Sequence, residues 1–240
     1  MAAQSFLLTR PAAASARFAR SLKESFGADI HVVISPLMTA VFLTHPLPPG
    51  PFDAVILTSE TAAEAARRIS AEQVSLPVRA FCVGDRTAQV ATEAGFLTLS
   101  AAGDADALVA LIQSRLPHAR FLHLRGRDGR GNIAERLNSG GSETYEAIVY
   151  DQRPCPLNAA ATALLAGPDP IILPLFSPRS ADLMVQTGPA RAPLWVAALS
   201  PAVAVHAAPL KPDRIAIAAQ PNAASMLQTL HCFLAAGRQT

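Results

Sequence analysis

The sequence predicts an α/β protein with two parallel-sheet lobes, one of which is discontinuous along the chain. Three observations lead to this prediction. Short apolar runs alternate with segments of helical periodicity, as in parallel sheets whose strands are connected by helices. Two proline-punctuated stretches bracket the middle of the chain, and a set of strand-to-helix turns recurs in both halves. The composition agrees, because 50% of the 240 residues are hydrophobic and only 16% are charged, which suits sheets covered on both faces.

The first segment is expected to contain a strand, a helix and a second strand. The apolar run SFLLT (5–9) has the pattern of a buried strand. Pro11 suits the first position of a helix, large apolar residues follow at every fourth position, and Gly27 stands where a helix would end. The run DIHVVIS (29–35) is then the second strand.

Prolines mark the expected domain boundaries. HPLPPGP (45–51) has four prolines in seven residues, which excludes a central strand or a helix interior. Because DQRPCP (151–156) is a second proline-punctuated stretch, the block between them is predicted to be a domain inserted into another. The expected divisions are one lobe from 1–35 and 153–240, crossings at 36–52 and 151–156, and a second lobe at 53–150.

Strands and helices alternate through the inserted block and again after it. The helix after the third strand of the block is expected to start at Asp104, and Asn222 is the expected N-cap of the last helix. The expected strands are AVILT (54–58), VRAFCVG (78–84), FLTLS (96–100), RFLHLRG (120–126), ETYEAIVY (143–150), IILPLF (171–176), LWVAALS (194–200) and RIAIAA (214–219).

The two halves share a pattern of strand-to-helix turns. Ser59 and Ser177 each end an apolar run and begin a helix. The next two turns follow after 25 and a further 20 positions at Gly84 and Asp104, and after 23 and a further 21 positions at Ser200 and Pro221. Three matches in the same order predict two similar lobes. We expect these lobes to face each other across a cleft.

The carboxyl ends of the expected strands carry small hydroxyl residues, glycine and arginine. Ligands of open parallel sheets bind at this edge, where backbone N–H groups and the helix dipole favour anions. We therefore expect many weak anion sites, with helix capping alone as the alternative role of each Ser and Thr. The candidate substrate-binding residues are Thr9, Arg10, Thr58, Ser59, Gly84, Thr87, Arg125, Gly126, Ser177, Pro178, Arg179, Ser180 and Ser200.

Two further features bear on chemistry. The loop LRGRDGRGN (124–132) holds Arg125, Arg127 and Arg130, whose guanidinium groups suit carboxylates or phosphates unless the loop is only a solvated surface. Tyr150 ends a strand just before the second crossing, where its hydroxyl could donate a proton to a leaving group. A tyrosine packed at a lobe boundary is the alternative interpretation of Tyr150.

Several classes of function are disfavoured. A net charge of +2 is too small for nucleic-acid binding by bulk electrostatics. No secretory signal and no apolar run of membrane-spanning length is evident, so we expect a cytoplasmic protein with no membrane partner. The scattered Cys82, Cys155 and Cys232 predict reduced thiols, and the dispersed histidines predict no metal. No Walker loop, Ser/His/Asp series or paired-carboxylate motif is present, so covalent catalysis is not expected.

In its motifs the chain resembles the uroporphyrinogen-III synthase family. The matching strings are LLTRP, DAVILTS, VGDRTA, LRGRDGR, YEAIVYDQRP and FSPRSAD. The order and spacing of these strings carry the resemblance more than any one of them does. The resemblance extends over nearly all of the 240 residues.

This resemblance implies two flavodoxin-like lobes joined by a two-stranded linker. It implies an enzyme that closes the linear tetrapyrrole hydroxymethylbilane to uroporphyrinogen III, with loss of water, inversion of the last ring and no metal or cofactor. A transient hand-off of substrate from hydroxymethylbilane synthase belongs to the same expectation. The tyrosine of the family that assists loss of the hydroxyl matches Tyr150, and its strand-end hydroxyl residues match Ser59, Thr87 and Ser177. Separately, the sequence shows no heptads or apolar stripe that would be exposed, so we expect a monomer.

One departure and two other interpretations stand beside this resemblance. Where the family usually has a Gly-Pro-Thr-Thr-Ala-like turn, this chain has SPAVA (200–204), so that Ser200 replaces the glycine. A two-lobed protein that binds an anion or a tetrapyrrole without catalysis would keep the same fold. A nucleotide-dependent enzyme is disfavoured by the absence of nucleotide-binding motifs.

Overall fold

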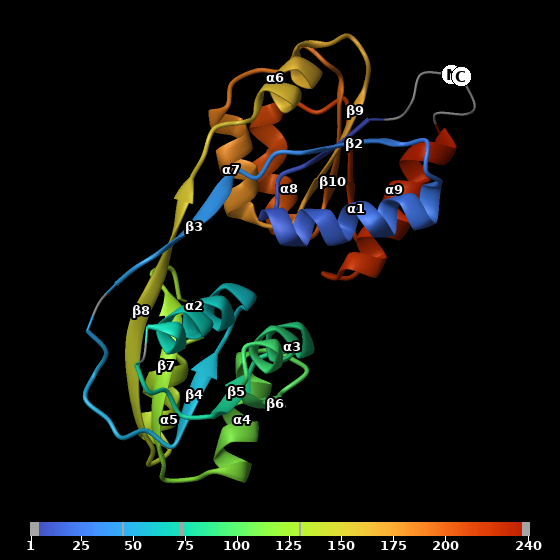
Figure 1. Cartoon of the computed structure of the whole chain (residues 1–240). Coiled ribbons are helices and arrows are strands. Elements are labelled where there is room, and N and C mark those ends of the chain that lie inside the picture. Colours follow the sequence, from blue (N-terminus) through green and yellow to red (C-terminus); the bar gives the residue numbers. More distant parts are fainter. Residues whose placement is uncertain (1–4, 45, 73, 130, 237–240) are drawn as a thin grey trace. The chain divides into compact units, whose positions relative to one another are not determined.

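The computed structural model describes residues 5–44, 46–72, 74–129 and 131–236. Two compact units make up the chain (Figure 1). Unit 1 is discontinuous and comprises Met1–Thr39 and Pro154–Thr240, whereas unit 2 is the continuous stretch Ala40–Arg153. Among the described residues, no helix is both long enough and apolar enough to cross a bilayer.

Unit 2 is a doubly wound sheet with the strand order β3-β8-β7-β4-β5-β6. Its strands are β3 (Met38–Phe42), β4 (Ala54–Leu57), β5 (Arg79–Cys82), β6 (Leu97–Ser100), β7 (Arg120–Gly126) and β8 (Glu143–Pro154). Its helices are α2 (Glu60–Ala71), α3 (Asp85–Glu93), α4 (Ala105–Arg115) and α5 (Ile133–Ser139). Strands β4 to β8 are parallel where they pair.

Helices cover both faces of the unit 2 sheet, which explains why β4 is an unbroken apolar run. All four residues of β4 are buried. Val55 and Leu57 pack with α2 and α3 on one face, and Ala54 and Ile56 pack with α4 and α5 on the other (Figure 1). A strand buried on both faces loses the alternation of polar and apolar residues. Its carboxyl end therefore lies at the centre of the unit's edge.

Unit 1 has a five-stranded parallel sheet with the order β11-β10-β9-β1-β2. Its strands are β1 (Ser5–Leu8), β2 (His31–Ile34), β9 (Ile171–Leu175), β10 (Leu194–Ala198) and β11 (Arg214–Ile217). Its helices are α1 (Ala12–Phe26), α6 (Ala159–Ala166), α7 (Pro178–Gln186), α8 (Pro201–Ala207) with the 3₁₀ turn Ala208–Leu210, and α9 (Ala223–Ala236). Helices α6, α7 and α8 pack on one face, while α1 and α9 pack on the other (Figure 1).

The two sheets have the same spatial order of strands when β9, the central strand of unit 1, is matched with β4 of unit 2. Strands β9, β10, β11, β1 and β2 then occupy the places of β4, β5, β6, β7 and β8. This confirms the repeat that was predicted from the spacing of the strand-to-helix turns. In chain order, unit 1 has the flavodoxin order 2-1-3-4-5, and the five parallel strands of unit 2 have the order 3-2-1-4-5.

The segments expected to be crossings contain more strand than the prolines suggested. The residue pattern did not predict strand β3, although the family resemblance implied a two-stranded linker, and β8 extends beyond Tyr150 as far as Pro154. Leu43 N donates to Val149 O at 3.0 Å and Cys155 N donates to Leu37 O at 3.0 Å, a register in which the two segments run antiparallel. Eight residues free of proline lie between Pro36 and the proline-rich stretch, and five of them form β3, which pairs with β8.

Candidate functional site

Ser59 begins α2 directly beyond the central strand of unit 2. Its backbone is extended (φ −158°, ψ 157°), and its Oγ accepts a hydrogen bond from Ala62 N at 3.0 Å. Ser59 is therefore a helix N-cap, as the capping alternative predicted. Its Oγ also lies 3.0 Å from the hydroxyl oxygen of Tyr150. One hydroxyl thus connects the start of α2 to the end of the parallel part of β8.

Tyr150 is held in place by Gly126 on the neighbouring strand. The β7–β8 register shifts between Arg125 and Gly126, which brings Gly126 opposite Tyr150. A Cβ at Gly126 would lie only 2.6 Å from Cε2 and Cζ of the tyrosine ring. Arg127 N donates to Tyr150 O at 3.0 Å, and only 9% of Tyr150 is exposed. The ring is therefore fixed against backbone, with its hydroxyl at Ser59.

A second polar cluster, Thr58–His123–Glu146–Arg125, lies on the other face of the same strand ends. Nε2 of His123 is 3.5 Å from Thr58 Oγ1, and its Nδ1 is 3.3 Å from Oε1 of Glu146. Burial lowers the pKa of His123 to about 4, and Arg125 acts in the same direction, while Glu146 opposes the shift. His123 is therefore neutral at pH 7 within the edge of the sheet.

Sequence reasoning missed His123 and Glu146. The available signal was a histidine inside the apolar strand pattern RFLHLRG. Its partner could not be read locally, because Glu146 lies opposite His123 only through the β7–β8 register.

Arg125 uses its guanidinium group within its own loop. Nη1 donates to the carbonyl oxygens of Gly126 (3.0 Å) and Arg127 (3.2 Å), and Nη2 donates to Oε2 of Glu146 (3.0 Å). Nε of Arg127 lies 3.4 Å from Oδ2 of Asp151, with which it forms a salt bridge. Arg130 is outside the described residues. The arginine loop is thus organised by internal hydrogen bonds, which favours a structural role for Arg125 over direct contact with a ligand.

The next turn of unit 2 leaves backbone N–H groups accessible. Gly84 is the N-cap of α3 and makes no side-chain cap, and a Cβ placed there would meet nothing within 4 Å. Thr87, in the first turn of α3, is 5% exposed. The side chain of Asp85 accepts a hydrogen bond from Ser100 at 2.7 Å. Open space above a helix start is what an anionic group needs for close approach.

In unit 1, two candidate serines are helix caps. Ser177 Oγ accepts from Ser180 N at 3.1 Å and lies 2.9 Å from Ser180 Oγ, and Pro178 occupies the first turn of α7. Ser200 caps α8 through a longer hydrogen bond from Val203 N, at 3.4 Å. The departure SPAVA therefore keeps a capped helix start.

The end of β1 carries the other candidates of unit 1. Thr9 is 1% exposed, and within the described residues its Oγ1 has no hydrogen-bond partner. The guanidinium of Arg10 lies 4.2 Å from the ring centroid of Phe176, which precedes Ser177. Arg179 is half-buried in the first turn of α7. Aromatic stacking of Arg10 leaves the edges of its guanidinium in a fixed orientation.

Seven of the predicted residues thus belong to unit 2 and seven to unit 1, and each group gathers at the carboxyl end of its own sheet. The closest grouping is Ser59, Gly126 and Tyr150, with Thr58 and Arg125 beside it. The unit 2 residues are Thr58, Ser59, Gly84, Thr87, Arg125, Gly126 and Tyr150, and the unit 1 residues are Thr9, Arg10, Ser177, Pro178, Arg179, Ser180 and Ser200.

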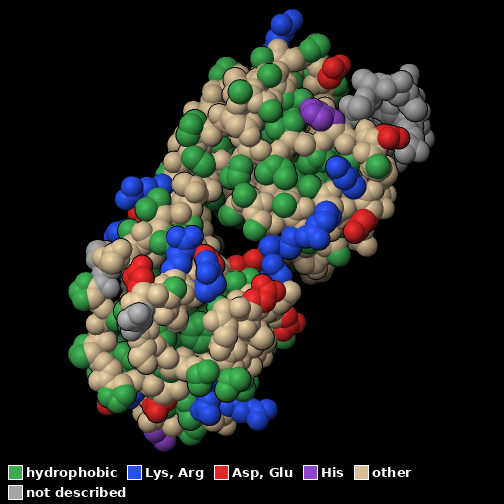
Figure 2. Space-filling model, viewed as in Figure 1, with side chains coloured by type: hydrophobic (Ala, Val, Ile, Leu, Met, Phe, Trp, Pro, Cys, Tyr) green, Lys and Arg blue, Asp and Glu red, His purple; other side chains and the backbone are tan. Residues whose placement is uncertain are grey.

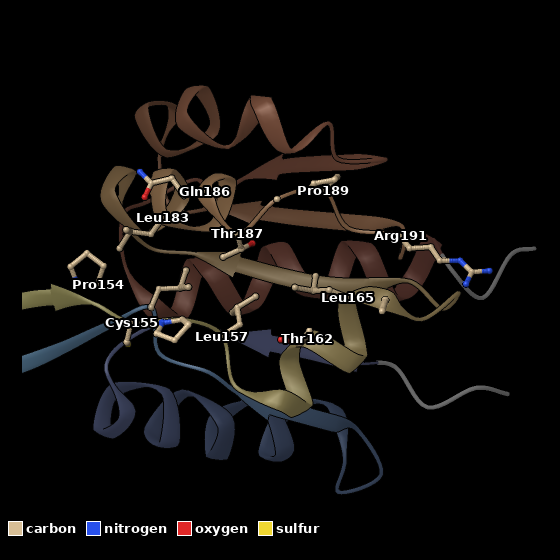
Figure 3. A pocket seen from close by; sticks show the side chains of 14 residues that line it. Pro154, Cys155, Leu157, Thr162, Leu165, Leu183, Gln186, Thr187, Pro189 and Arg191 are labelled. Carbon is tan, nitrogen blue, oxygen red and sulfur yellow. The ribbon is translucent and has the colours of Figure 1, made fainter.

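Each unit also has a large cavity away from these strand ends. In unit 1 a cavity of about 640 Å³ is lined by Leu183, Gln186 and Thr187 at the C-terminal end of α7 (Figure 3). The equivalent residues of α2, 118 positions earlier in the chain, are Ala65, Arg68 and Ile69. They line a cavity of about 1030 Å³ in unit 2. Because the repeat of the fold reproduces these grooves, we attribute them to the architecture rather than to the chemistry.

The surface charge agrees with a ligand bound by several modest contacts. Basic and acidic side chains are interspersed on the face shown in Figure 2. Such a surface suits recognition by helix starts and by individual side chains rather than by one strongly charged patch.

These features define a class: a two-unit, doubly wound α/β protein whose candidate site combines helix N-termini with a fixed tyrosine. A model of the family described as uroporphyrinogen-III synthase HemD matches residues 17–228. The chain belongs to the uroporphyrinogen-III synthase family. This membership supports the synthase function.

Solved structures show the same fold. The uroporphyrinogen-III synthetase of Helicobacter pylori 26695 is 16% identical, with a TM-score of 0.65 over 96% of this chain and 99% of that one. A mutant uroporphyrinogen III synthase of Thermus thermophilus is 15% identical, with a TM-score of 0.50 over 97% and 99% of the two chains. No curated protein sequence matched the chain.

Proposed function

We propose that this chain is a lyase that closes hydroxymethylbilane to uroporphyrinogen III, with loss of water and inversion of the last ring. The observation that carries the proposal is the Tyr150 hydroxyl, which is held 3.0 Å from Ser59 at the start of α2 on a ring that Gly126 keeps in place. Family membership supplies the substrate class. We propose the cytoplasm as its location and a monomer as its working form.

Carboxylate recognition is the first task, because hydroxymethylbilane carries acetate and propionate arms on every ring. The helix starts at Ser59, Gly84, Ser177 and Ser200 present backbone N–H groups and the positive end of the helix dipole. Arg10, stacked on Phe176, adds a guanidinium. Within each unit, such contacts can bind carboxylate arms without one strong site, and they require no cofactor.

Loss of the hydroxyl is the second task, and we assign it to Tyr150. The phenol proton goes to the leaving hydroxyl as the C–O bond breaks and water departs. The pyrrole nitrogen supplies the electron pair for the new exocyclic C=C bond. When the last ring has attacked, the substrate returns a proton to the phenolate. The sum is one substrate converted to one macrocycle and one water, with the enzyme unchanged.

Orientation is the third task. The substrate eliminates water readily because its pyrroles are electron-rich, so the protein's main contribution is to select the carbon through which the last ring closes. Holding reacting groups in place can supply up to about 7–11 kcal/mol. Rigid helix starts suit this task better than a mobile set of acids and bases would.

The decisive experiment incubates the purified protein with hydroxymethylbilane and separates the I and III isomers of the product by chromatography. Spontaneous closure gives only the uninverted isomer I, so the proposal predicts that isomer III predominates with native protein and is missing with heat-inactivated protein. A product ratio that does not change on adding native protein would refute the synthase.

One observation favours a second candidate, a tetrapyrrole-binding protein without catalysis. Ser59, Ser177 and Ser200 all cap helices, and Arg125 donates hydrogen bonds within its own loop. Several of the candidate substrate-binding residues therefore have structural roles. Saturable binding of hydroxymethylbilane with isomer I as the only product would establish this candidate. We propose the enzyme first, because binding alone gives no use for a fixed tyrosine hydroxyl. The same binding measurement with hydroxymethylbilane synthase present would test a transient hand-off.

A further inference from the structure

The hydroxyl of Ser59 makes two hydrogen-bonding contacts, and their chemistry constrains the proton of Tyr150. Ala62 N can only donate, so its 3.0 Å bond to Ser59 Oγ uses an oxygen lone pair. The serine proton then remains available. Its nearest partner is the Tyr150 hydroxyl oxygen, also 3.0 Å away. An oxygen that accepts from a helix N–H is a better donor through its own proton, because linked hydrogen bonds polarise one another.

Tyr150 cannot easily choose a different partner. Its ring lies against the backbone of Gly126 and its own carbonyl accepts from Arg127 N at 3.0 Å. Within the part of the chain that the structure describes, Ser59 is the one side chain that hydrogen-bonds to its hydroxyl. If Ser59 donates, the phenol proton is left without a protein acceptor among these residues, and it is free for a ligand.

We propose that Ser59 is a positioning residue that donates its hydroxyl proton to the Tyr150 oxygen and so directs the phenol proton toward the leaving hydroxyl of the substrate. The inference rests on the proposed function, in which Tyr150 assists loss of water. It gives Ser59 a role different from substrate binding, because Ser59 acts through Tyr150. The reverse arrangement, in which Tyr150 donates to Ser59, would turn the phenol proton away from the substrate.

Replacements at Ser59 separate capping from donation. Aspartate and asparagine cap helices about as well as serine. An aspartate carboxylate has no proton to donate at pH 7, whereas asparagine can accept from Ala62 N with its oxygen and donate to Tyr150 with its amide. We therefore expect Ser59→Asn and Ser59→Thr to keep most of kcat. Ser59→Asp and Ser59→Ala should lower kcat on the order of tenfold, part of the 10²–10⁴-fold that a positioned acid contributes.

The added charge of Ser59→Asp should raise KM for a polyanion, but the donation argument concerns kcat. Wild-type kcat in Ser59→Asp, whatever its KM, would overturn the proposal. Unfolding by urea, followed by far-ultraviolet circular dichroism, should show Ser59→Asp and Ser59→Asn as stable as wild type.

A double-mutant cycle tests whether Ser59 acts through Tyr150. In a Tyr150→Phe background the phenol is gone, so Ser59→Ala should lower kcat no further than Tyr150→Phe alone. If the two effects multiply instead, Ser59 contacts the substrate directly and the proposal fails.

A spectroscopic measurement makes the inference testable without turnover. The chain has two tyrosines, so ¹³Cζ-labelled tyrosine gives two signals, and Tyr145→Phe assigns them. The Tyr150 signal should shift in the same direction in Ser59→Ala and Ser59→Asp, because the phenol oxygen loses its donor in each. The shift should be larger in Ser59→Asp, where the phenol also becomes a donor to the carboxylate. The Tyr145 signal should stay in place as an internal reference.

Shifts in opposite directions in the two variants would overturn the proposal, because a phenol that donates to Ser59 loses its acceptor in Ser59→Ala and gains a stronger one in Ser59→Asp. Because this measurement needs no substrate, it decides the direction of the hydrogen bond even if the protein forms no isomer III. Failure of the inference and failure of the proposed function are thereby distinguished.

Discussion

The ring of Tyr150 occupies the space that a side chain at Gly126 would need. A Cβ there would lie 2.6 Å from two ring carbons and 2.9 Å from the hydroxyl oxygen. Gly126 is therefore glycine because of a close approach, and the position of the tyrosine depends on it.

Gly126→Ser should displace the ring and lower both stability and turnover. Overpacking typically costs about 1–3 kcal/mol, so the urea midpoint should fall clearly below that of wild type. Gly84→Ser is the matched control, because the same atoms are added at a helix start with nothing within 4 Å, where a serine can also cap α3. Equal loss of stability in both variants would contradict the close-approach explanation.

Tyr150→Phe should lower turnover while the protein remains folded. Removing the hydroxyl deletes the proposed proton donor and the contact with Ser59, but it leaves the ring packed on Gly126. We expect kcat to fall on the order of 10²-fold, within the range for a positioned acid. Isomer-resolved kinetics measures the turnover of the variant, and circular dichroism measures its folding. Wild-type turnover in Tyr150→Phe would remove Tyr150 from the mechanism.

His123 should make the protein less stable as the pH falls from about 6.5 to 4. Its pKa is lowered from 6.5 in the unfolded chain to about 4 in the folded one by burial beside Arg125. Below pH 6.5 the unfolded state therefore binds a proton that the folded state does not, and unfolding is favoured by about 1.4 kcal/mol per unit of pKa difference. His123→Gln should flatten the pH dependence of unfolding free energy in this window. An unchanged pH dependence would show that His123 is not held neutral.

Ser177 and Ser200 should differ as helix caps. Ser177 Oγ accepts from Ser180 N at 3.1 Å. Ser200 Oγ accepts from Val203 N at 3.4 Å, which is a longer and weaker hydrogen bond. Ser177→Ala should lower the unfolding free energy by about 1 kcal/mol, and Ser200→Ala by less. Ser177→Asn should recover the loss because asparagine caps as well as serine. Urea unfolding measures all three, and an equal loss at both serines would contradict the ranking.

The three cysteines should react with a thiol reagent in the order Cys232, Cys155, Cys82. Cys232 is exposed and Cys155 is half-buried, with its Sγ donating to Pro36 O at 2.9 Å. Burial raises the pKa of Cys82 to about 12, so at pH 8 its reactive thiolate is nearly absent. Peptide mass spectrometry after timed labelling of the native protein measures the order. Early labelling of Cys82 would show that β5 is not buried as described.

The sequence was informative wherever the signal is local. Apolar runs located the strands, Gly27 marked the end of α1 with a φ of 93°, and Asn222 caps α9 by accepting from Ser225 N at 2.9 Å, as expected. The repeat was readable because both halves keep similar spacings between turns. Capping roles were also foreseeable, since Ser at a helix start caps by a bond three residues away.

Contacts between distant segments could not be read in this way. Ser59 and Tyr150 are 91 positions apart, and Glu146 reaches His123 only through the register of two strands. The hydrogen bonds of Arg125 to loop carbonyls were also unreadable, because the bulge beside Gly126 brings those carbonyls within its reach. Register and bulges depend on pairing partners rather than on neighbours in the chain.

The permuted connectivity of the two units has a consequence for synthesis. Unit 2 is one continuous stretch, so every strand it needs has been made once β8 leaves the ribosome. In unit 1, strand β1 lies between β2 and β9, and β9 is translated more than 160 residues after β1. One side of β1 therefore stays unpaired while the whole of unit 2 is produced, so the half of the protein that begins first is completed last.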